Sequence, residues 1–286
     1  MYNLSKTKLA IGILLLLSGM SASPINATPQ VQSVASYFDS SWKVITSDEE
    51  GPTPGLGGQA FDAEYLLYKI EGSILYLGLQ SGFDLIDGYQ YFDTYSQDHY
   101  WAGDLALSFD GDAIITSSDP IAMANSYEFG IDFGLRTADY NSNTVDATNP
   151  SVDGLVEGKD KAGVYRVGEG EWNTNMVNSF EDNSSPFAMN QQWSGTGTNP
   201  YLASLTLNTA GQEDRSYYRA VAFNLTQLGL NLSNLRMDVH WTMSCGNDNI
   251  NGSQQISVPE PSVLFLIFTG LICLVGRRNS KVTCVN

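Results

Sequence analysis

The chain has 286 residues, of which 11% are aromatic and 16% charged, and its 31 acidic against 14 basic side chains give a formal net charge of −17. This length suffices for one large domain or two ordinary ones. A charge so negative argues against nucleic-acid binding, which depends on cations that neutralise phosphates, and disfavours contact with anionic lipid surfaces.

Residues 1–27 have the three parts of a secretory signal peptide. Lys6 and Lys8 precede the apolar run Leu9–Leu17, and small residues follow it. Cleavage after Ala22, after Ser23 or after Ala27 fits this pattern, and we place the end of the signal at Ala27. We therefore expect an exported protein.

The exported stretch from Thr28 to Val258 is more acidic than the whole chain, with nine basic against thirty acidic side chains and a net charge of −21. Such a charge favours solubility and the binding of divalent cations. Cys245 is the one cysteine in this stretch, so we expect an ordinary hydrophobic core rather than disulfides to hold it.

Strand signals dominate residues 28–250, because short apolar or alternating runs stand between clusters of Gly, Asn, Asp and Ser. The clearest is a hairpin, with strands Ala63–Ile70 and Ile74–Gln80 joined by Glu71-Gly72-Ser73. Further strands are predicted within 104–112, 126–135, 163–172, 201–210, 217–225 and 235–243.

The pattern predicts an all-β fold, a single β-sandwich of jelly-roll-like type over residues 28–250. The polar segment Thr137–Gly163 is expected to be a long surface loop, although it also fits a boundary between two small domains. Residues 251–257 are expected to be a polar linker that leads to a C-terminal signal at 258–281.

An aromatic cluster between Asp87 and Trp101 is the best candidate for ligand contact. Tyrosine and tryptophan among Asp and Gln can stack on a sugar face while the polar groups bind its hydroxyls. The same residues are also ordinary strand and core residues. The candidate ligand-binding residues are Tyr89, Tyr91, Tyr95, Tyr100 and Trp101.

Acidic pairs suggest calcium as a candidate cofactor, because calcium takes six to eight oxygen ligands. Asp110 and Asp112 flank a glycine near the end of a predicted strand, and Asp84 and Asp87 have a similar position. Neither pair matches the spacing of a known calcium loop, so turn-forming aspartates are the simpler interpretation.

Catalytic residues are hard to assign. His240 and Cys245 stand five residues apart, and on one strand they would point to opposite faces. We expect a surface histidine and a half-buried strand cysteine rather than a catalytic pair, and we expect no enzyme. A hydrolase that uses a carboxylate pair stays a third hypothesis, but no spacing selects the pair.

The C-terminal end combines a rigid turn, an apolar segment and basic residues. Pro259 and Pro261 keep the backbone extended, and the apolar segment Val263–Val275 is marginal as a membrane helix, which needs about 20 residues. Arg277 and Arg278 supply the positive flank that halts translocation. An extended peptide beside the membrane is a suitable substrate for a membrane-embedded protease, whereas a plain single-pass tail anchor is the alternative.

This arrangement resembles a PEP-CTERM sorting signal of Gram-negative bacteria that make extracellular polysaccharide. The resemblance covers about the last twenty-five residues. It implies that Pro259, Glu260 and Pro261 are recognised by an exosortase, a membrane-embedded cysteine protease, and that Arg277-Arg278 ends the membrane segment. The residues Asn279–Asn286 after the arginines depart from the tails that this family often has.

The resemblance implies an exported protein that passes through the inner membrane and is delivered to the cell surface or the extracellular matrix. We expect a structural or adhesive role associated with exopolysaccharide or biofilm. The strands at 61–83, 103–112 and 127–134 are similar to those of carbohydrate-binding and DOMON-like modules. The alternative function is therefore a carbohydrate-binding module that uses the aromatic loop 87–101.

Overall fold

The computed structural model of the chain describes residues 33–48, 58–91, 99–135, 161–174, 184–189 and 199–257. Most of the regular structure in these ranges is β-strand, and the helices there are short. The prediction of an all-β fold is therefore confirmed for this part of the chain. The expected signal peptide and sorting signal lie outside the described residues. In the described ranges, no helix has the length and apolar character needed to cross a membrane.

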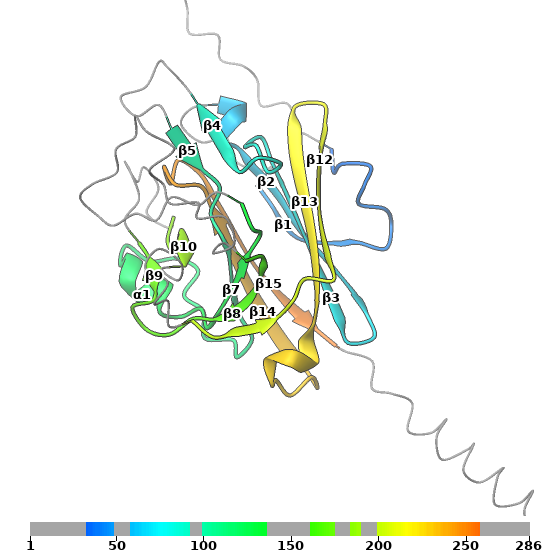
Figure 1. Ribbon diagram of the computed structural model, residues 1–286, viewed down its shortest axis with the longest axis vertical. Coiled ribbons are helices and arrows are strands. Elements are labelled where there is room, and N and C mark those ends of the chain that lie inside the picture. The colour runs from blue at the N-terminus through cyan, green and yellow to red at the C-terminus, as the bar shows by residue number, and fades with distance from the viewer. Residues whose placement is uncertain are drawn as a thin grey trace, which may run out of the picture. The chain divides into compact units, whose positions relative to one another are not determined.

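One antiparallel sheet has five strands in the order β1-β2-β3-β13-β12 (Figure 1). The predicted hairpin is confirmed, since Glu71 pairs with Ile74 and Gly72 has a φ of 61° in the turn between them. Glycine adopts this left-handed conformation without steric cost. The strands of this sheet are β1 (Lys43–Ser47), β2 (Ala63–Glu71), β3 (Ile74–Ser81), β12 (Leu207–Glu213) and β13 (Ser216–Asn224).

A second antiparallel sheet has six strands in the order β11-β8-β7-β6-β14-β15. After β13 in the five-stranded sheet, the chain crosses back to the six-stranded sheet, where β14 lies beside β6. This gives the Greek-key order β14-β6-β7-β8. The strands are β6 (Leu105–Ser108), β7 (Phe129–Asp132), β8 (Gly163–Arg166), β11 (Tyr201–Ala203), β14 (Leu235–Thr242) and β15 (Asn249–Ile256).

The connectivity differs from the jelly-roll form that the sequence predicts. A jelly roll contains two Greek keys, whereas most consecutive strands here stay within one sheet. The short connections at Gly72-Ser73 and Asp214-Arg215 explain this difference, because each allows only a hairpin between neighbouring strands.

Two further strand pairs and three short helices complete the described elements. Helix α1 begins after Asp119, whose side chain accepts hydrogen bonds from the backbone N–H groups of Ile121 and Ala122 and so caps the helix. The elements are β4 (Tyr89–Tyr91), β5 (His99–Trp101), β9 (Trp172–Asn173), β10 (Ala188–Met189), α1 (Pro120–Ala124), η1 (Gly58–Phe61) and η2 (Leu225–Leu228).

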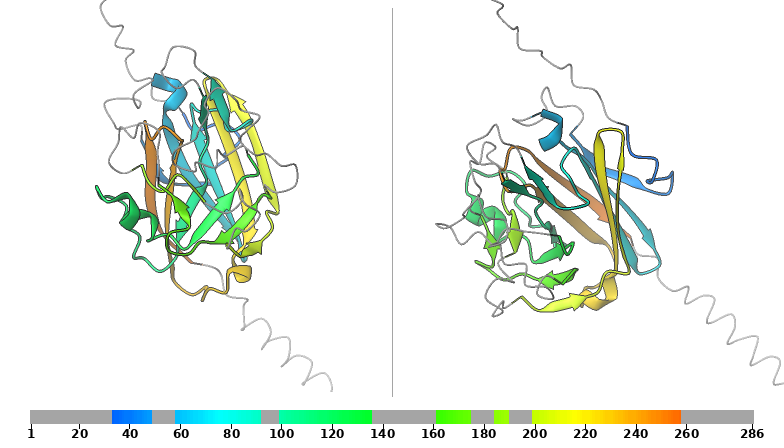
Figure 2. Two further views of the ribbon diagram at one scale, coloured as in Figure 1. Left: turned by 60° about the vertical axis from the view of Figure 1, so that its left-hand side comes forward. Right: turned by 45° about the horizontal axis from the view of Figure 1, so that its top comes forward.

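The main core lies between the two large sheets, which face each other in Figure 2. Side chains alternate along a strand, so Leu75, Leu77 and Leu79 of β3 enter it from one sheet, and Val239 and Trp241 of β14 from the other. Each of the five is at most 1% exposed, and full burial of such a side chain contributes roughly 1.5–3 kcal/mol. This shared core fits the predicted sandwich.

The outer face of the six-stranded sheet is covered as well. Ala106 and Tyr165 of that sheet pack with Ala124 of α1, Trp172 of β9 and Met189 of β10. Figure 1 shows α1, β9 and β10 grouped on the side of this sheet that faces away from the five-stranded sheet. The outward-pointing side chains of Asp238, His240 and Thr242 on β14 are buried on this covered face, whereas Arg236 near the start of the strand is exposed.

Of the residues 251–257 that the sequence predicts as a linker, 251–256 belong to the sheet. Strand β15 pairs continuously with β14, from Thr242 opposite Asn249 to Leu235 opposite Ile256. Its sequence appears polar because only two isoleucines, Ile250 and Ile256, enter the main core, while backbone hydrogen bonds to β14 hold the strand. The sheet thus continues to Ile256, and only two residues separate it from Pro259.

Candidate functional site

The structure divides the predicted aromatic cluster. Tyr89 and Tyr91 lie on β4 opposite Trp101 and His99 of β5, and Tyr91 is 55% exposed. Tyr100 and Trp101 are only 6% and 1% exposed and pack as core residues, so they present no open face for a sugar. Tyr95 lies outside the described residues.

The protein has a second aromatic surface, which the sequence does not predict because its residues come from four separate segments. Tyr37 stacks on Tyr218 with ring centroids 4.9 Å apart, and Trp42 meets Tyr76 edge-on at 6.2 Å. The Lys69 ammonium lies 4.5 Å from the centroid of the Tyr76 ring. These side chains lie on the outer face of the five-stranded sheet and are partly exposed.

The expectation of a surface histidine and a half-buried strand cysteine is wrong. His240 is fully buried on β14 with Nδ1 bonded to the Asn251 side chain, and Cys245 is buried beyond the end of β14. Burial lowers the pKa of His240 to about 4 and raises the pKa of Cys245 to about 12. These shifts favour a neutral imidazole and a protonated thiol, which is the opposite of what thiol catalysis requires.

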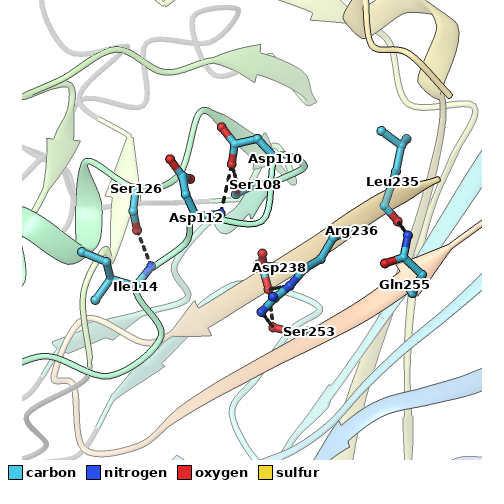
Figure 3. Close-up of polar contacts among 10 residues, drawn as sticks. All are labelled: Ser108, Asp110, Asp112, Ile114, Ser126, Leu235, Arg236, Asp238, Ser253 and Gln255. Atoms are coloured by element: carbon cyan, nitrogen blue, oxygen red, sulfur yellow. Dashed lines mark hydrogen bonds and ion pairs between the residues drawn. The ribbon is translucent and has the colours of Figure 1, made fainter. Parts of the chain in front are cut away.

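The strongest candidate site is the acidic loop after β6. We define this loop as Asp110-Gly111-Asp112. The Asp110 carboxylate accepts hydrogen bonds from the Ser108 hydroxyl at 2.9 Å and from the Asp112 backbone N–H at 3.3 Å. The backbone N–H of Ile114 donates to the Ser126 hydroxyl at 2.8 Å, which fastens the segment after the loop to the turn before β7. Figure 3 shows these contacts.

Glu128 joins this loop, although no local sequence pattern marks it as a ligand. One oxygen from each of Asp110, Asp112 and Glu128 lies within 4.8 Å of the others. Burial, followed by the charge of Asp110, raises the pKa of Glu128 to about 7. The pairing of Leu107 with Phe129 brings Glu128 to the end of β6, so a correct alignment of these two strands would have revealed it.

A fourth carboxylate, Asp238 of β14, lies beneath the acidic loop. It is 0% exposed and pairs across the sheet with Ser108. Its Oδ1 atom contacts the Ser253 hydroxyl and the Arg236 Nε at 3.3 Å, whereas its Oδ2 atom has no hydrogen-bond partner. In Figure 3 this second oxygen points away from Arg236 and Ser253 and toward the acidic loop.

Gly111 allows the acidic loop to lie close to β14. Its φ is +85°, and a Cβ atom added there would lie 3.2 Å from the Cδ atom of Arg236. The loop therefore packs on the aliphatic stem of Arg236 while the guanidinium reaches Asp238.

A second acidic cluster, Asp48, Asp62 and Asp248, also has carboxylate oxygens within 4.8 Å of one another. Both oxygens of Asp248 are used within the protein, by the backbone N–H groups of Ala63 at 2.7 Å and of Asn249 at 2.8 Å. Burial raises the pKa of Asp248 to about 8; the hydrogen bonds from Ala63 and Asn249 oppose this shift, and the charges of Asp48 and Asp62 add to it. This aspartate joins the starts of β2 and β15.

The other aspartate pair considered from the sequence forms a turn. The Asp84 side chain accepts hydrogen bonds from the backbone N–H groups of Ile86 at 2.8 Å and of Asp87 at 3.0 Å. The interpretation as turn-forming residues is confirmed for this pair.

The C-terminal sorting signal follows directly after β15. The model of the PEP-CTERM protein-sorting motif matches residues 257–279. The chain carries a PEP-CTERM sorting motif. This PEP-CTERM protein is thereby marked as an exported substrate for exosortase-dependent sorting to the cell surface. The motif residues Pro259, Glu260, Pro261 and Arg277-Arg278 lie outside the described residues. No curated protein and no solved structure matches the chain.

Proposed function

We propose that this PEP-CTERM protein is a non-enzymatic component of the bacterial surface or extracellular matrix, with a structural or adhesive role beside exopolysaccharide. The observation that carries the proposal is the sorting motif at residues 257–279. The buried, neutral state favoured for His240 and Cys245 also supports a role without thiol catalysis.

The position of the motif supports processing at Pro259-Glu260-Pro261. Ile256 is the last residue of β15 and pairs with Leu235, so this strand ends two residues before Pro259. Cleavage near the motif would release the membrane segment and leave the β-sheet domain intact at the surface.

The test is C-terminal mass spectrometry of the protein from cells with and without the sorting protease. We expect mature protein that lacks Arg277-Arg278 in normal cells and retains them when the protease is deleted or when Glu260→Ala is introduced. Ser280→Ala, a change downstream of the arginines, is the matched control and should mature normally. An intact tail on mature protein from normal cells would instead indicate a plain membrane anchor.

The alternative function is a carbohydrate-binding module. The exposed side chain of Tyr91 supports sugar binding at the aromatic loop 87–101. A second candidate sugar-binding surface has partly exposed aromatic rings, namely those of Tyr37, Trp42, Tyr76 and Tyr218. Affinity electrophoresis through the bacterium's own exopolysaccharide distinguishes the two places by Tyr91→Ala and Trp42→Ala. Equal mobility of the wild-type protein with and without the polysaccharide would remove this alternative.

A further inference from the structure

We propose that Asp110, Asp112, Glu128 and Asp238 form a calcium-binding site between the acidic loop and strand β14. Three of these carboxylates converge from the end of β6 and the start of β7. The fourth lies on the neighbouring strand β14, directly across from Ser108. The three converging carboxylates come from the ends of β6 and β7, and Asp238 of β14 supplies a buried fourth carboxylate beneath them.

The spacing of the oxygens suits calcium. Calcium–oxygen distances are about 2.3–2.6 Å, so two ligands on opposite sides of one ion lie roughly 4.6–5.2 Å apart. The three carboxylate oxygens lie within 4.8 Å of one another, and one ion can therefore contact all of them. Magnesium demands a near-ideal octahedral arrangement at about 2.0–2.1 Å and gives up its waters reluctantly, so we expect it to bind this carboxylate cluster more weakly.

The buried oxygen of Asp238 is the second and independent sign of a ligand. A buried acceptor without a partner is costly, and the Oδ2 atom of Asp238 has none in the structure. The Tyr127 hydroxyl is also buried without a partner. The charges of Asp238 and Glu128 both act on Tyr127 and, after burial, raise its pKa. A cation bound at the acidic loop would satisfy the oxygen of Asp238.

The charge balance also favours a cation. Within the described residues, the ion pair that these four carboxylates make is that of Asp238, whose Oδ1 atom lies 3.3 Å from Arg236 Nε. This contact occupies the oxygen that faces away from the acidic loop and leaves Oδ2 for the ion. Calcium prefers six to eight oxygens, so backbone carbonyls of the loop and water would complete its coordination.

Calorimetric titration of the full-length protein in detergent with CaCl2, after removal of metals by a chelator, tests the proposal. We expect one calcium per chain, with a Kd on the order of 10⁻⁴–10⁻³ M as in extracellular modules, and weaker binding of MgCl2. Asp112→Asn and Asp238→Asn should each weaken calcium binding by at least about tenfold. Asp48→Asn, in the other acidic cluster, is the matched control and should bind like wild type.

Several results would overturn the site. One is a wild-type protein that takes up no calcium at about 10 mM, and another is an Asp112→Asn variant with unchanged affinity. If only Asp48→Asn lost calcium binding, the ion would have to bind at the second cluster, Asp48, Asp62 and Asp248. Because Asp238 is buried, near-ultraviolet circular dichroism must show that Asp238→Asn folds; if it does not, Asp112→Asn and Glu128→Gln decide the outcome.

Discussion

Asp238 on β14 lies directly opposite Ser108 on β6, and the Ser108 hydroxyl donates to Asp110 at 2.9 Å. The serine thus stands between the buried and the exposed carboxylate of the proposed calcium site. Its hydroxyl also lowers the pKa of Glu128, against the larger effect of burial. The Ser108 side chain therefore helps to orient Asp110 without being a ligand itself.

Ser108→Ala should weaken calcium binding about fivefold to tenfold, because a hydrogen bond to a charged group contributes roughly 1.5–3 kcal/mol and part of this orients Asp110. Ser41→Ala is the control, since the Ser41 hydroxyl makes the corresponding bond to Asp39 in the segment before β1, outside the proposed site. Calorimetry on both variants measures the difference. If Ser108→Ala and wild type bind calcium with equal affinity, the Ser108 hydroxyl is not needed to orient Asp110.

Asp248 predicts a specific dependence of stability on pH. Its pKa is raised from 3.8 to about 8 in the folded protein, so the unfolded chain loses this proton first as the pH rises. The stabilising contribution is fully present below about pH 4 and is lost between about pH 4 and pH 8.

Denaturant titrations of wild type and Asp248→Asn, both with a calcium chelator present, measure this effect. As the pH rises from about 4 to about 8, the unfolding free energy of wild type should fall steadily relative to that of Asp248→Asn. Asp39→Asn is the control, because the pKa of the exposed Asp39 is lowered by its bonds from Ser41 and its effect belongs to lower pH. A difference that is constant between pH 4 and pH 8 would contradict the raised pKa.

Cys245 should resist alkylation in the folded protein. With a pKa of about 12, roughly one thiol in ten thousand is ionised at pH 8, and only the thiolate reacts. Peptide mapping after iodoacetamide treatment should find Cys245 unmodified under native conditions and fully modified in guanidinium. Rapid native labelling of Cys245 would indicate an accessible thiol and reopen the hypothesis of thiol catalysis.

Gly252 tests whether residues 251–257 are structural. A Cβ atom at this position would lie 2.6 Å from Ile45 Cγ2 and 2.9 Å from Thr46 Cγ2, so β15 and β1 meet too closely for a side chain. Gly252→Ala should lower the free energy of unfolding by about 1–3 kcal/mol. Gly168→Ala, whose Cβ would meet its nearest atom at 3.5 Å, should change stability much less. Equal stabilities would restore the linker interpretation.

The sequence predicted those elements whose signals are local. The hairpin of β2 and β3 combines strong apolar strands with a glycine in the turn, so pattern and turn chemistry agree. Strand β15 was missed because its neighbour β14 supplies its hydrogen bonds, and no local pattern reports such a partner. Glu128 and Asp238 were missed for the same reason, since only the pairing of β6 with β7 and β14 brings them to Asp110. The burial of His240 likewise depends on the cover over the outer face of its sheet.

The short spacing between β15 and the sorting motif should limit processing. Ile256 is fixed by its pairing with Leu235, and the two residues between Ile256 and Pro259 span only about 7 Å when extended. A protease that takes an extended peptide into its cleft needs free chain on both sides of the motif. Deletion of Ser257 and Val258 should therefore slow maturation in a pulse-chase experiment, whereas replacing both by alanine, the length-matched control, should leave the rate unchanged. An unaltered rate in the deletion variant would mean that the end of β15 opens during processing or that the protease binds only residues after Pro259.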